Sequence, residues 1–313
     1  MRQNVKDIIN HRDFLITDGA AGSHLEAMGC DLNDSLWTAK ILKENPALIK
    51  QLHYDYFQAG ADFGVTVSYQ ATIDGFIQQG MSHTQAIDLI KSSACLLLEA
   101  RDEWWHQEGK NQHRMYPITT GSIGPYGAYL ADGSEYRGDY ELPRETLRKF
   151  HQPRIELLWE QGIDMFAVET IPRLDEAIVI TEIIQALGAK CWISFSAKDD
   201  HHISHGQAIH ECIRALEPYG CIVALGINCT APQYISGLVK QIQSSTQKPI
   251  VAYGNLGQHY DPNTKVWAEH HHGNSKEYLE YVQEWKSQGV RIIGGCCGTT
   301  PNDIKQIACS VNE

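Results

Sequence analysis

Short apolar runs alternate with longer segments of helical spacing along this 313-residue chain, and this alternation restricts the available folds more than any other feature. Strand-like runs occur at residues 14–20, 63–69, 117–124, 165–170, 191–197, 221–229, 249–255 and 291–297. Strands that alternate with helices form parallel sheets, because parallel neighbours need a crossover connection. The runs are nearly continuous in apolar content, as is typical of strands buried on both faces.

The segments between these runs show the periodicity of amphipathic helices. We expect helices within residues 44–60, 82–105, 143–162, 173–188, 208–218, 233–243, 274–289 and 301–311. Several of these segments end on glycine, a residue that commonly terminates a helix before the next strand. The endings are Gly60, Gly162, Gly188 and Gly289.

Eight strand–helix units predict a single (β/α)8 TIM barrel over residues 1–313, since such barrels usually take about 250 residues plus insertions. A doubly wound open sheet is the alternative. It is disfavoured because the segment after the first run, DGAAGSHLE, lacks the G-x-G-x-x-G spacing of a dinucleotide-binding loop. The two longest insertions, residues 125–143 and 257–274, both follow strands, so we expect both on the catalytic face of the barrel.

Charge and apolar content narrow the function classes. The net charge is −12, from 38 acidic and 26 basic side chains, and no basic tract stands out, which argues against a nucleic-acid partner. No apolar stretch approaches the ~18 residues of a membrane span. The N-terminal segment lacks the apolar core of a signal peptide. We therefore expect a cytoplasmic enzyme that acts on small molecules, without a membrane partner.

Three of the nine cysteines follow predicted strands: Cys229 after the sixth strand, and Cys296 with Cys297 after the eighth. A barrel would bring these strand ends to one face. Catalytic zinc takes three protein ligands and leaves a fourth position for water or substrate. The spacing therefore favours one zinc ion over a redox pair of Cys296 and Cys297 or two packed thiols. The fourth ligand in the absence of substrate stays open.

The other cysteines lie elsewhere in the predicted fold, at strand starts, within helices or in the first connection. We interpret them as small buried apolar residues, a common role for free cysteine. They are Cys30, Cys95, Cys191, Cys212, Cys221 and Cys309.

The adjacent pair Cys296 and Cys297 is unusual, because successive side chains of a regular strand point to opposite faces. Gly294, Gly295 and Gly298 surround the pair. Glycine takes backbone dihedrals that are closed to other residues. We expect these glycines to end the strand and turn both thiols toward one ion.

Several motifs resemble the homocysteine S-methyltransferase family along the whole chain. GINC at residues 226–229 and GGCCGTTP at 294–301 are similar to its zinc-binding signature. Further matches are TDGA at 17–20, SLWTAK at 35–40, SYQAT at 68–72, GSIGPYGAYLADGSEYRGDY at 121–140 and VET at 168–170. The long stretch at 121–140 resembles the corresponding stretch of the family members that use S-methylmethionine as methyl donor. The resemblance implies a (β/α)8 barrel that binds one zinc ion through Cys229, Cys296 and Cys297.

By this resemblance, the protein transfers a methyl group from S-methylmethionine, or S-adenosylmethionine, to the thiolate of L-homocysteine and so makes methionine. Three cysteine thiolates would keep the homocysteine sulfur electron-rich as the fourth ligand of zinc. The sulfonium donor releases a neutral thioether, so we expect no catalytic residue beyond the zinc site. The alternatives are a non-catalytic structural zinc barrel and a thiol redox protein that uses Cys296 and Cys297.

The remaining strand ends supply candidate substrate-binding residues. Asp18 and Glu169 are expected to bind the ammonium group of homocysteine, and the resemblance favours Glu169 most strongly. Backbone amides near Ala20 and Ser122 are candidates for its carboxylate. Helix capping or neutralisation of a buried partner is the alternative role for the two acidic residues.

Aromatic residues near the same strand ends are candidates for the methyl donor. Tyr69, Tyr126 and Tyr129 are positioned to face the sulfonium cation through their π systems, or simply to pack the insertion at 125–143. The three histidines at 270–272 resemble a metal-binding tract. We interpret them as loop residues, because thiolates already fill the zinc site.

Two stretches depart from the family pattern. Residues 18–25 read DGAAGSHL, where the family usually has D-G-A-M-(A/G)-T-x-L. Residues 253–257 read YGNLG, where the family commonly has Y-P-N-(S/A)-G. Neither change replaces a cysteine, so the departures bear on the shape of the substrate pocket and leave the donor preference open.

Overall fold

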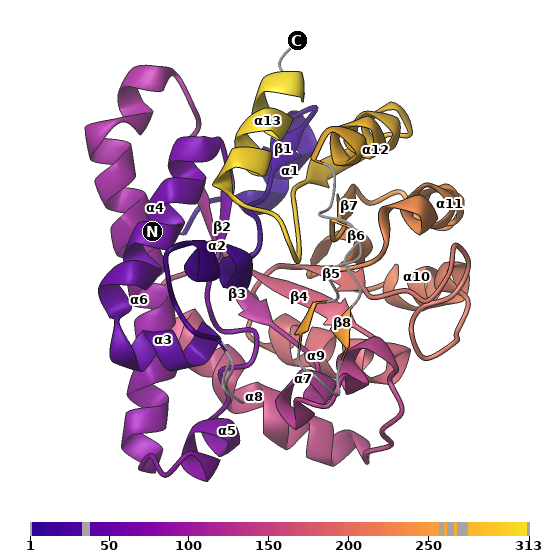
Figure 1. The fold of residues 1–313 in the computed structure, drawn as a ribbon. Helices are drawn as coiled ribbons and strands as arrows, with labels where there is room; N and C mark the ends of the chain where they lie inside the picture. Colours follow the sequence, from indigo (N-terminus) through magenta and orange to yellow (C-terminus); the bar gives the residue numbers. More distant parts are fainter. Residues whose placement is uncertain (1, 33–37, 257–259, 262–265, 268–274, 312–313) are drawn as a thin grey trace.

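The computed structural model describes residues 2–32, 38–256, 260–261, 266–267 and 275–311, and its fold is the expected (β/α)8 barrel (Figure 1). Eight parallel strands are hydrogen-bonded in the order β1-β10-β7-β6-β5-β4-β3-β2. Thr17 and Phe63 form a further parallel bridge, which joins the β1 and β2 ends of this order. The strands are β1 (Leu15–Ile16), β2 (Phe63–Val65), β3 (Ile118–Ile123), β4 (Met165–Ile171), β5 (Cys191–Phe195), β6 (Ile222–Asn228), β7 (Ile250–Tyr253) and β10 (Val290–Ile293).

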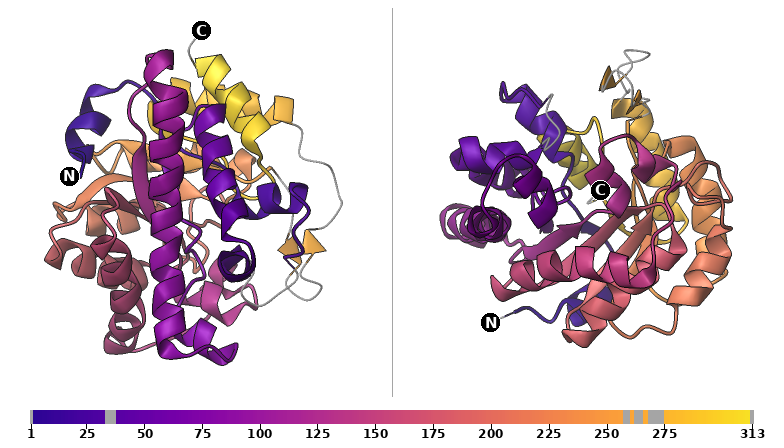
Figure 2. Two further views of the ribbon diagram at one scale, coloured as in Figure 1. Left: turned by 90° about the vertical axis from the view of Figure 1, so that its left-hand side faces the viewer. Right: turned by 90° about the horizontal axis from the view of Figure 1, so that it is seen from below.

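Helices surround the sheet on its outer side (Figures 1 and 2). The eight predicted helices are confirmed as α4 (Pro46–Ala59), α6 (His83–Gln107), α8 (Arg144–Glu160), α9 (Leu174–Ala186), α10 (Ile209–Leu216), α11 (Pro232–Gln243), α12 (Ser275–Ser287) and α13 (Pro301–Val311). Gly60, with φ of 124°, follows α4 in a left-handed conformation that other residues rarely adopt. Glycine therefore ends this helix, as the sequence predicted.

Five short α-helices in the described part of the protein were not predicted from the sequence. They are α1 (Val5–His11), α2 (Ala21–Ala27), α3 (Thr38–Glu44), α5 (Ile73–Gln78) and α7 (Tyr126–Leu130). None exceeds 7 residues, and two helical turns are too short for periodicity to separate a helix from a loop. Among the residues described, no helix combines the length and apolar content needed to cross a membrane.

The two largest apolar clusters of the described residues stabilise the barrel. The larger one joins the outward-facing strand residues to the helices around them. The smaller one fills the inside of the barrel, where Phe63, Met165 and Trp192 pack together with Val5 and Ile9 of α1. The barrel interior is therefore a packed core, and the space for a ligand lies at one end of it.

The insertion after β3 is folded, whereas the one after β7 is described only in part. Residues 125–143 contain α7 and the 3-10 helix η2 (Ser134–Tyr136). A Cβ atom on Gly127 of α7 would lie 2.6 Å from the backbone nitrogen of Glu135, so the two pieces pack closely. In the second insertion, β8 (Tyr260–Asp261) pairs with β9 (Val266–Trp267) in antiparallel fashion. The histidines at 270–272 lie outside the described residues.

Candidate active site

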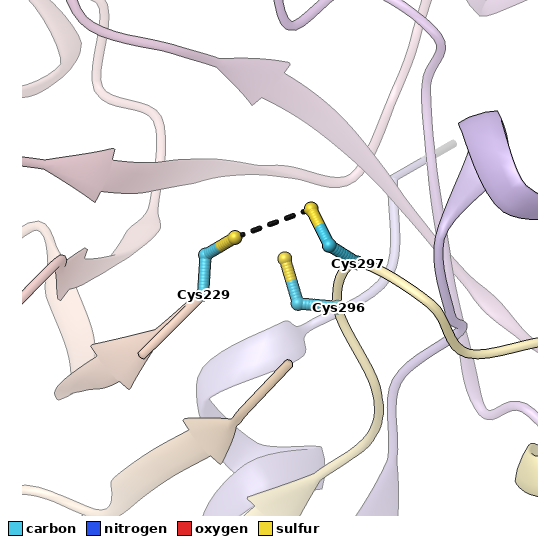
Figure 3. A group of neighbouring side chains, drawn as sticks. All are labelled: Cys229, Cys296 and Cys297. Atoms are coloured by element: carbon cyan, nitrogen blue, oxygen red, sulfur yellow. Dashed lines mark hydrogen bonds between the residues drawn. The ribbon is translucent and has the colours of Figure 1, made fainter. Parts of the chain in front are cut away.

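Three thiols meet at the carboxyl ends of β6 and β10 (Figure 3). Cys229 directly follows β6, while Cys296 and Cys297 follow β10. The three sulfur atoms all lie within 4.8 Å of one another, and Sγ of Cys229 is 3.3 Å from Sγ of Cys297. Cys229 and Cys297 are buried, and Cys296 is half-buried. The structure thus brings together the three cysteines that the sequence singled out.

The glycines around the pair act differently from expectation. Cys296 and Cys297 lie in a turn beyond the strand, so the alternation of strand side chains does not apply to them. Only Gly298 is left-handed, with φ of 87°. Gly294 and Gly295 are needed for another reason, because a Cβ atom on either would lie 2.3 Å from a threonine side chain. The prediction from dihedral freedom is therefore wrong for these two glycines, which permit close packing instead.

The strand ends at the site hold two non-glycine residues in the left-handed region. Cys229 has φ of 46° and Thr170 has φ of 57°. Such conformations persist only where the surroundings enforce them. For Thr170 they do: its backbone N–H donates to Oδ1 of Asn228 over 2.6 Å, and its Oγ1 accepts from Nδ2 of Asn228 over 2.7 Å. Asn228 is the residue before Cys229, so both strained positions belong to one hydrogen-bonded unit.

The thiol cluster fits a zinc ion in chemistry and spacing. Zinc–sulfur bonds of ~2.3 Å in a tetrahedron place sulfur atoms about 3.8 Å apart, which is compatible with three sulfur atoms that all lie within 4.8 Å of one another. Hydrogen bonds from the thiols of Cys296 and Cys297 hold the pKa of Cys229 well below its usual range. A bound cation would deprotonate the thiols that hold it.

A cavity opens beside the thiols at this end of the barrel. Both predicted acidic residues, Asp18 and Glu169, line it together with the three cysteines. Ser122 of β3, Asn228 of β6 and Tyr253 of β7 also line it. One cavity therefore offers sulfur ligands and carboxyl groups to the same small molecule.

Glu169 is a half-buried residue whose carboxyl group lies between two hydroxyl groups. The hydroxyl of Ser122 contacts its Oε1, and the hydroxyl of Tyr253 lies 2.9 Å from its Oε2. Burial raises the pKa of Glu169 to about 7, against the lowering effect of these two hydrogen bonds. Among the described residues no cationic side chain offsets its charge. The neighbours of this carboxyl group in the described part of the protein are therefore hydroxyl groups and thiols, not cations.

Asp18 lies at the end of β1, on the same cavity. Its Oδ2 accepts a hydrogen bond from the backbone N–H of Val65 over 2.7 Å. Burial raises the pKa of Asp18 well above its usual value, and the nearby charge of Glu169 raises it further. The carboxyl groups of Asp18 and Glu169 thus line one cavity and lie close enough for the charge of Glu169 to raise the pKa of Asp18.

The two backbone amides predicted to hold a carboxylate already have partners. The N–H of Ala20 donates to Oγ1 of Thr299 over 3.1 Å. The N–H of Ser122 donates to Oγ1 of Thr66 over 2.9 Å. A substrate carboxylate would have to share or displace these acceptors, so the role of Ala20 and Ser122 in carboxylate binding stays a prediction.

The three predicted tyrosines lie in two different places. Tyr69 lines the cavity. Tyr126 and Tyr129 are not among its lining residues, and their rings instead pack on Phe150 of α8, with centroids 4.8 and 5.4 Å away. The structure therefore brings one tyrosine of the predicted set to the site.

Tyr136 is a site residue that the sequence reasoning missed. It belongs to η2 in the insertion after β3, lines the cavity, and places its hydroxyl 3.4 Å from Sγ of Cys229. The available signal was its place in the same insertion as Tyr126 and Tyr129. The sequence of an irregular insertion does not show which of its tyrosines reaches the site, because this depends on how the insertion folds.

The chain matches a known family over almost its whole length. A family model described as homocysteine S-methyltransferase covers residues 15–311. The chain belongs to the homocysteine S-methyltransferase family. As a member of this family it is a methyltransferase, and the resemblance inferred from its motifs is confirmed.

Individual relatives agree with this assignment. The chain is 47% identical over 305 residues to homocysteine S-methyltransferase YbgG of Bacillus subtilis, covering 97% of this chain and 96% of the relative. It is 42% identical over 308 residues to homocysteine S-methyltransferase of Escherichia coli, covering 97% and 98%. The crystal structure of the metallated homocysteine methyltransferase MmuM from Escherichia coli is similar with a TM-score of 0.87 and 38% identity, covering 98% and 100%.

Both departures from the family pattern contact the turn that carries the thiols. Oγ of Ser23 accepts a hydrogen bond from the backbone N–H of Gly298 over 2.9 Å. The backbone N–H of Leu256 donates to the carbonyl of Cys297 over 3.0 Å. These residues thus support the thiol-bearing turn, even though neither replaces a cysteine.

Proposed function

We propose that this protein transfers a methyl group from a sulfonium donor to the sulfur of L-homocysteine, giving methionine. The observation that carries the proposal is the shared cavity, which three thiols and two carboxyl groups line together. Homocysteine has the two matching parts, a thiol that a thiophilic metal binds and an ammonium group that carboxylates bind. S-methylmethionine is the proposed donor, with S-adenosylmethionine as the alternative.

The proposed cofactor is one zinc ion per chain, held by Cys229, Cys296 and Cys297. Zinc bound there would keep the homocysteine sulfur deprotonated, and therefore nucleophilic, at neutral pH. The open cavity beside the thiols supports a catalytic site over a closed structural one. A redox pair of Cys296 and Cys297 is less well supported, since the thiol of Cys297 contacts that of Cys229 over 3.3 Å and all three thiols form one group.

Glu169 and Asp18 are proposed to bind the ammonium group of homocysteine. A cation between them would replace their mutual repulsion by two attractions and would favour the ionised form of both carboxyl groups. Ser122 and Tyr253 would orient Glu169 through the hydroxyl groups that already contact it. The thiol end of the substrate would then reach the sulfur cluster on the same cavity wall, which fixes the direction of the attacking atom.

Tyr69 and Tyr136 are proposed to face the methyl donor. Both line the cavity, and tyrosine rings stabilise cations through their π faces. A sulfonium already carries a neutral thioether as its leaving group, so in-line transfer of its methyl requires no proton donor. The task of the residues around the donor is then orientation and exclusion of water.

We further propose that residues 1–313 act as one domain and that the protein works in the cytoplasm. A reducing compartment would keep the three thiols free to bind the metal. The substrates are small molecules, and the net charge of −12 suits a cationic donor.

The test is a methionine-formation assay with homocysteine and each sulfonium donor in turn. We expect turnover by the wild-type protein and its loss in Cys297→Ala, with loss of bound zinc. Cys309→Ala is the matched control, because Cys309 is an exposed thiol on α13. Turnover by Cys297→Ala at the wild-type rate would contradict the proposed mechanism.

A further inference from the structure

A chain of hydrogen-bonded polar side chains runs from Glu169 to Cys296 across four adjacent strands, β4 to β7. The hydroxyl of Tyr253 lies 2.9 Å from Oε2 of Glu169 and 2.9 Å from Oγ of Ser194. Ser194 in turn donates to Oδ1 of Asn228 over 2.8 Å. Nδ2 of Asn228 lies 3.9 Å from Sγ of Cys296 and points its second proton to that sulfur. The chain thus joins the two groups proposed to hold opposite ends of homocysteine.

The orientation of the Asn228 amide is determined by its neighbours. Its oxygen accepts from the backbone N–H of Thr170 over 2.6 Å, and a backbone N–H can only donate. The oxygen must therefore face Thr170, and the amino group must face Oγ1 of Thr170 and Sγ of Cys296. Asn228 is 1% exposed, so water cannot compete for these positions.

The hydroxyl groups of Ser194 and Tyr253 have one proton each, and this limit links their hydrogen-bond pattern to the charge of Glu169. The amide oxygen of Asn228 only accepts, so the single proton of Ser194 goes to it, and Ser194 can only accept from Tyr253. The hydroxyl of Tyr253 has a single proton to donate. Its third contact does not use this proton, because Nε1 of Trp192 donates to the same oxygen over 3.1 Å. If that proton goes to Ser194, the contact with Glu169 needs a proton on the acid.

An ionised Glu169 requires the opposite arrangement. The carboxylate then takes the proton of Tyr253, and Ser194 loses the donor to its oxygen. Binding of an ammonium group at Glu169 favours the carboxylate. It would therefore reverse the direction of the hydrogen bond between Tyr253 and Glu169, so that Tyr253 donates. The two states of Glu169 therefore differ in the hydrogen bonds of Tyr253 and in the donor to Ser194, and Ser194 in both states donates to the amide next to Cys296.

We propose that Tyr253, Ser194 and Asn228 are positioning residues, whose hydrogen-bonded chain couples the carboxyl group of Glu169 to the sulfur of Cys296. The coupling orients this sulfur ligand when the amino end of homocysteine is bound. The inference rests on the proposed function, because it requires homocysteine at Glu169 and a metal at the thiols. None of the three residues needs to touch the methyl group that is transferred.

The location of the chain favours this role over simple packing. Ser194 and Tyr253 are buried in the barrel interior, where apolar side chains would fill the same space without needing partners. Removal of a hydrogen-bond partner of a metal ligand typically lowers metal affinity or activity by about 10- to 100-fold. The chain reaches Cys296 through one such partner, Asn228.

The first test is Ser194→Ala, which interrupts the chain without removing a group that contacts Glu169 or Cys296. Zinc affinity is measured by competition with a chelator, and the cobalt(II)-substituted protein is titrated with homocysteine in visible absorption. We expect about a tenfold decrease in kcat, an altered cobalt spectrum with homocysteine, and an unchanged KM for the donor. A merely structural role would lower Tm and leave the cobalt spectrum as in the wild type.

Tyr253→Phe decides the question if Ser194→Ala does not fold. It should alter the cobalt spectrum in the same way and also raise the KM for homocysteine, since it removes a contact of Glu169. The double variant should lose no more kcat than Tyr253→Phe alone, because both changes break one chain. Fully additive losses, or two single variants with wild-type kcat and cobalt spectra, would overturn the proposal.

Ser93→Ala is the matched control. Ser93 is equally buried, but its hydroxyl donates only to the carbonyl of Ile90 within its own helix, over 2.7 Å. This variant should keep the wild-type spectrum and kcat. A wild-type protein that binds no zinc or forms no methionine would overturn the proposed function itself. Normal wild-type behaviour with unaffected Ser194 and Tyr253 variants would overturn only the coupling.

Discussion

The hydroxyl oxygen of Tyr136 lies 3.4 Å from Sγ of Cys229, although 93 residues separate them in the chain. Tyr136 belongs to η2, so the insertion after β3 reaches the thiol cluster directly. Burial raises the pKa of the Tyr136 phenol well above its usual value. The hydroxyl therefore remains protonated and can donate to the sulfur atom.

Tyr136→Phe should lower kcat while leaving the zinc content unchanged. The substitution removes the hydroxyl next to Cys229 and keeps the ring on the cavity wall. We expect a loss of about 5- to 10-fold, which corresponds to one hydrogen bond of ~1 kcal/mol. Tyr129→Phe is the control, since the hydroxyl of Tyr129 contacts Gln78 outside the cavity. Equal losses in both variants would argue against a special role for the contact with Cys229.

Glu169→Gln should raise the KM for homocysteine by about 10- to 100-fold, because a hydrogen bond to a charged group contributes ~1.5–3 kcal/mol. The amide keeps the shape of the side chain and its contacts with Ser122 and Tyr253. The KM for the sulfonium donor should stay the same. Steady-state kinetics with each substrate varied in turn would check this, and a rise in the donor KM alone would contradict the assignment.

The raised pKa of Glu169 predicts how stability depends on pH. Folding raises this pKa from its usual value of 4.5 to about 7, so the folded protein holds the proton more tightly. The resulting stabilisation is fully present below pH 4.5 and is lost as pH rises through about 7. Between about pH 5 and pH 8.5, the wild type should lose about 2 to 3 kcal/mol of unfolding free energy relative to Glu169→Gln.

Chemical denaturation of both proteins at the two pH values, without substrate and at equal zinc content, would measure this difference. The comparison with Glu169→Gln cancels the contributions of the other titrating groups. A difference between the two proteins that is constant with pH would show that Glu169 is ionised throughout the range.

The fold was predictable from the sequence wherever an element was long enough to show its period. α6, with 25 residues, shows seven helical turns of periodic apolar positions. α2, with 7 residues, begins at an alanine whose predecessor provides no side-chain cap, so it has neither period nor start signal. Such short helices form because the barrel around them supplies the contacts.

The candidate site was predictable only where topology alone brings residues together. Cys229 and Cys297 follow strands, and the carboxyl ends of barrel strands meet on one face. Ser194 lies inside β5, and nothing in its local sequence distinguishes it from a buried core serine. Tyr136 depends on the path of an irregular insertion. Residues that act through tertiary hydrogen bonds carry no periodic signal, so they could not be found before the structure.

Removal of zinc should abolish methionine formation and leave the barrel folded. The thiols lie in turns beyond the strands, whereas the two apolar clusters that stabilise the barrel extend over the strands and helices. Far-UV circular dichroism should therefore persist after chelation, with a lower Tm, and added zinc should restore activity. Loss of the dichroism signal on chelation would instead indicate a structural zinc site, as in small domains that fold only with metal.

Gly294→Ala should destabilise the protein and weaken zinc binding, because the new Cβ atom would lie 2.3 Å from Cγ2 of Thr17 and 2.7 Å from its backbone oxygen. The backbone between β10 and Cys296 must then move, and overpacking of this kind costs about 1–3 kcal/mol. Gly220→Ala is the matched control, since a Cβ atom there has no heavy atom within 4 Å among those described. Thermal unfolding and chelator competition on both variants would check the prediction. If Gly294→Ala retained wild-type Tm and zinc affinity, close packing would not be the reason for glycine at this position.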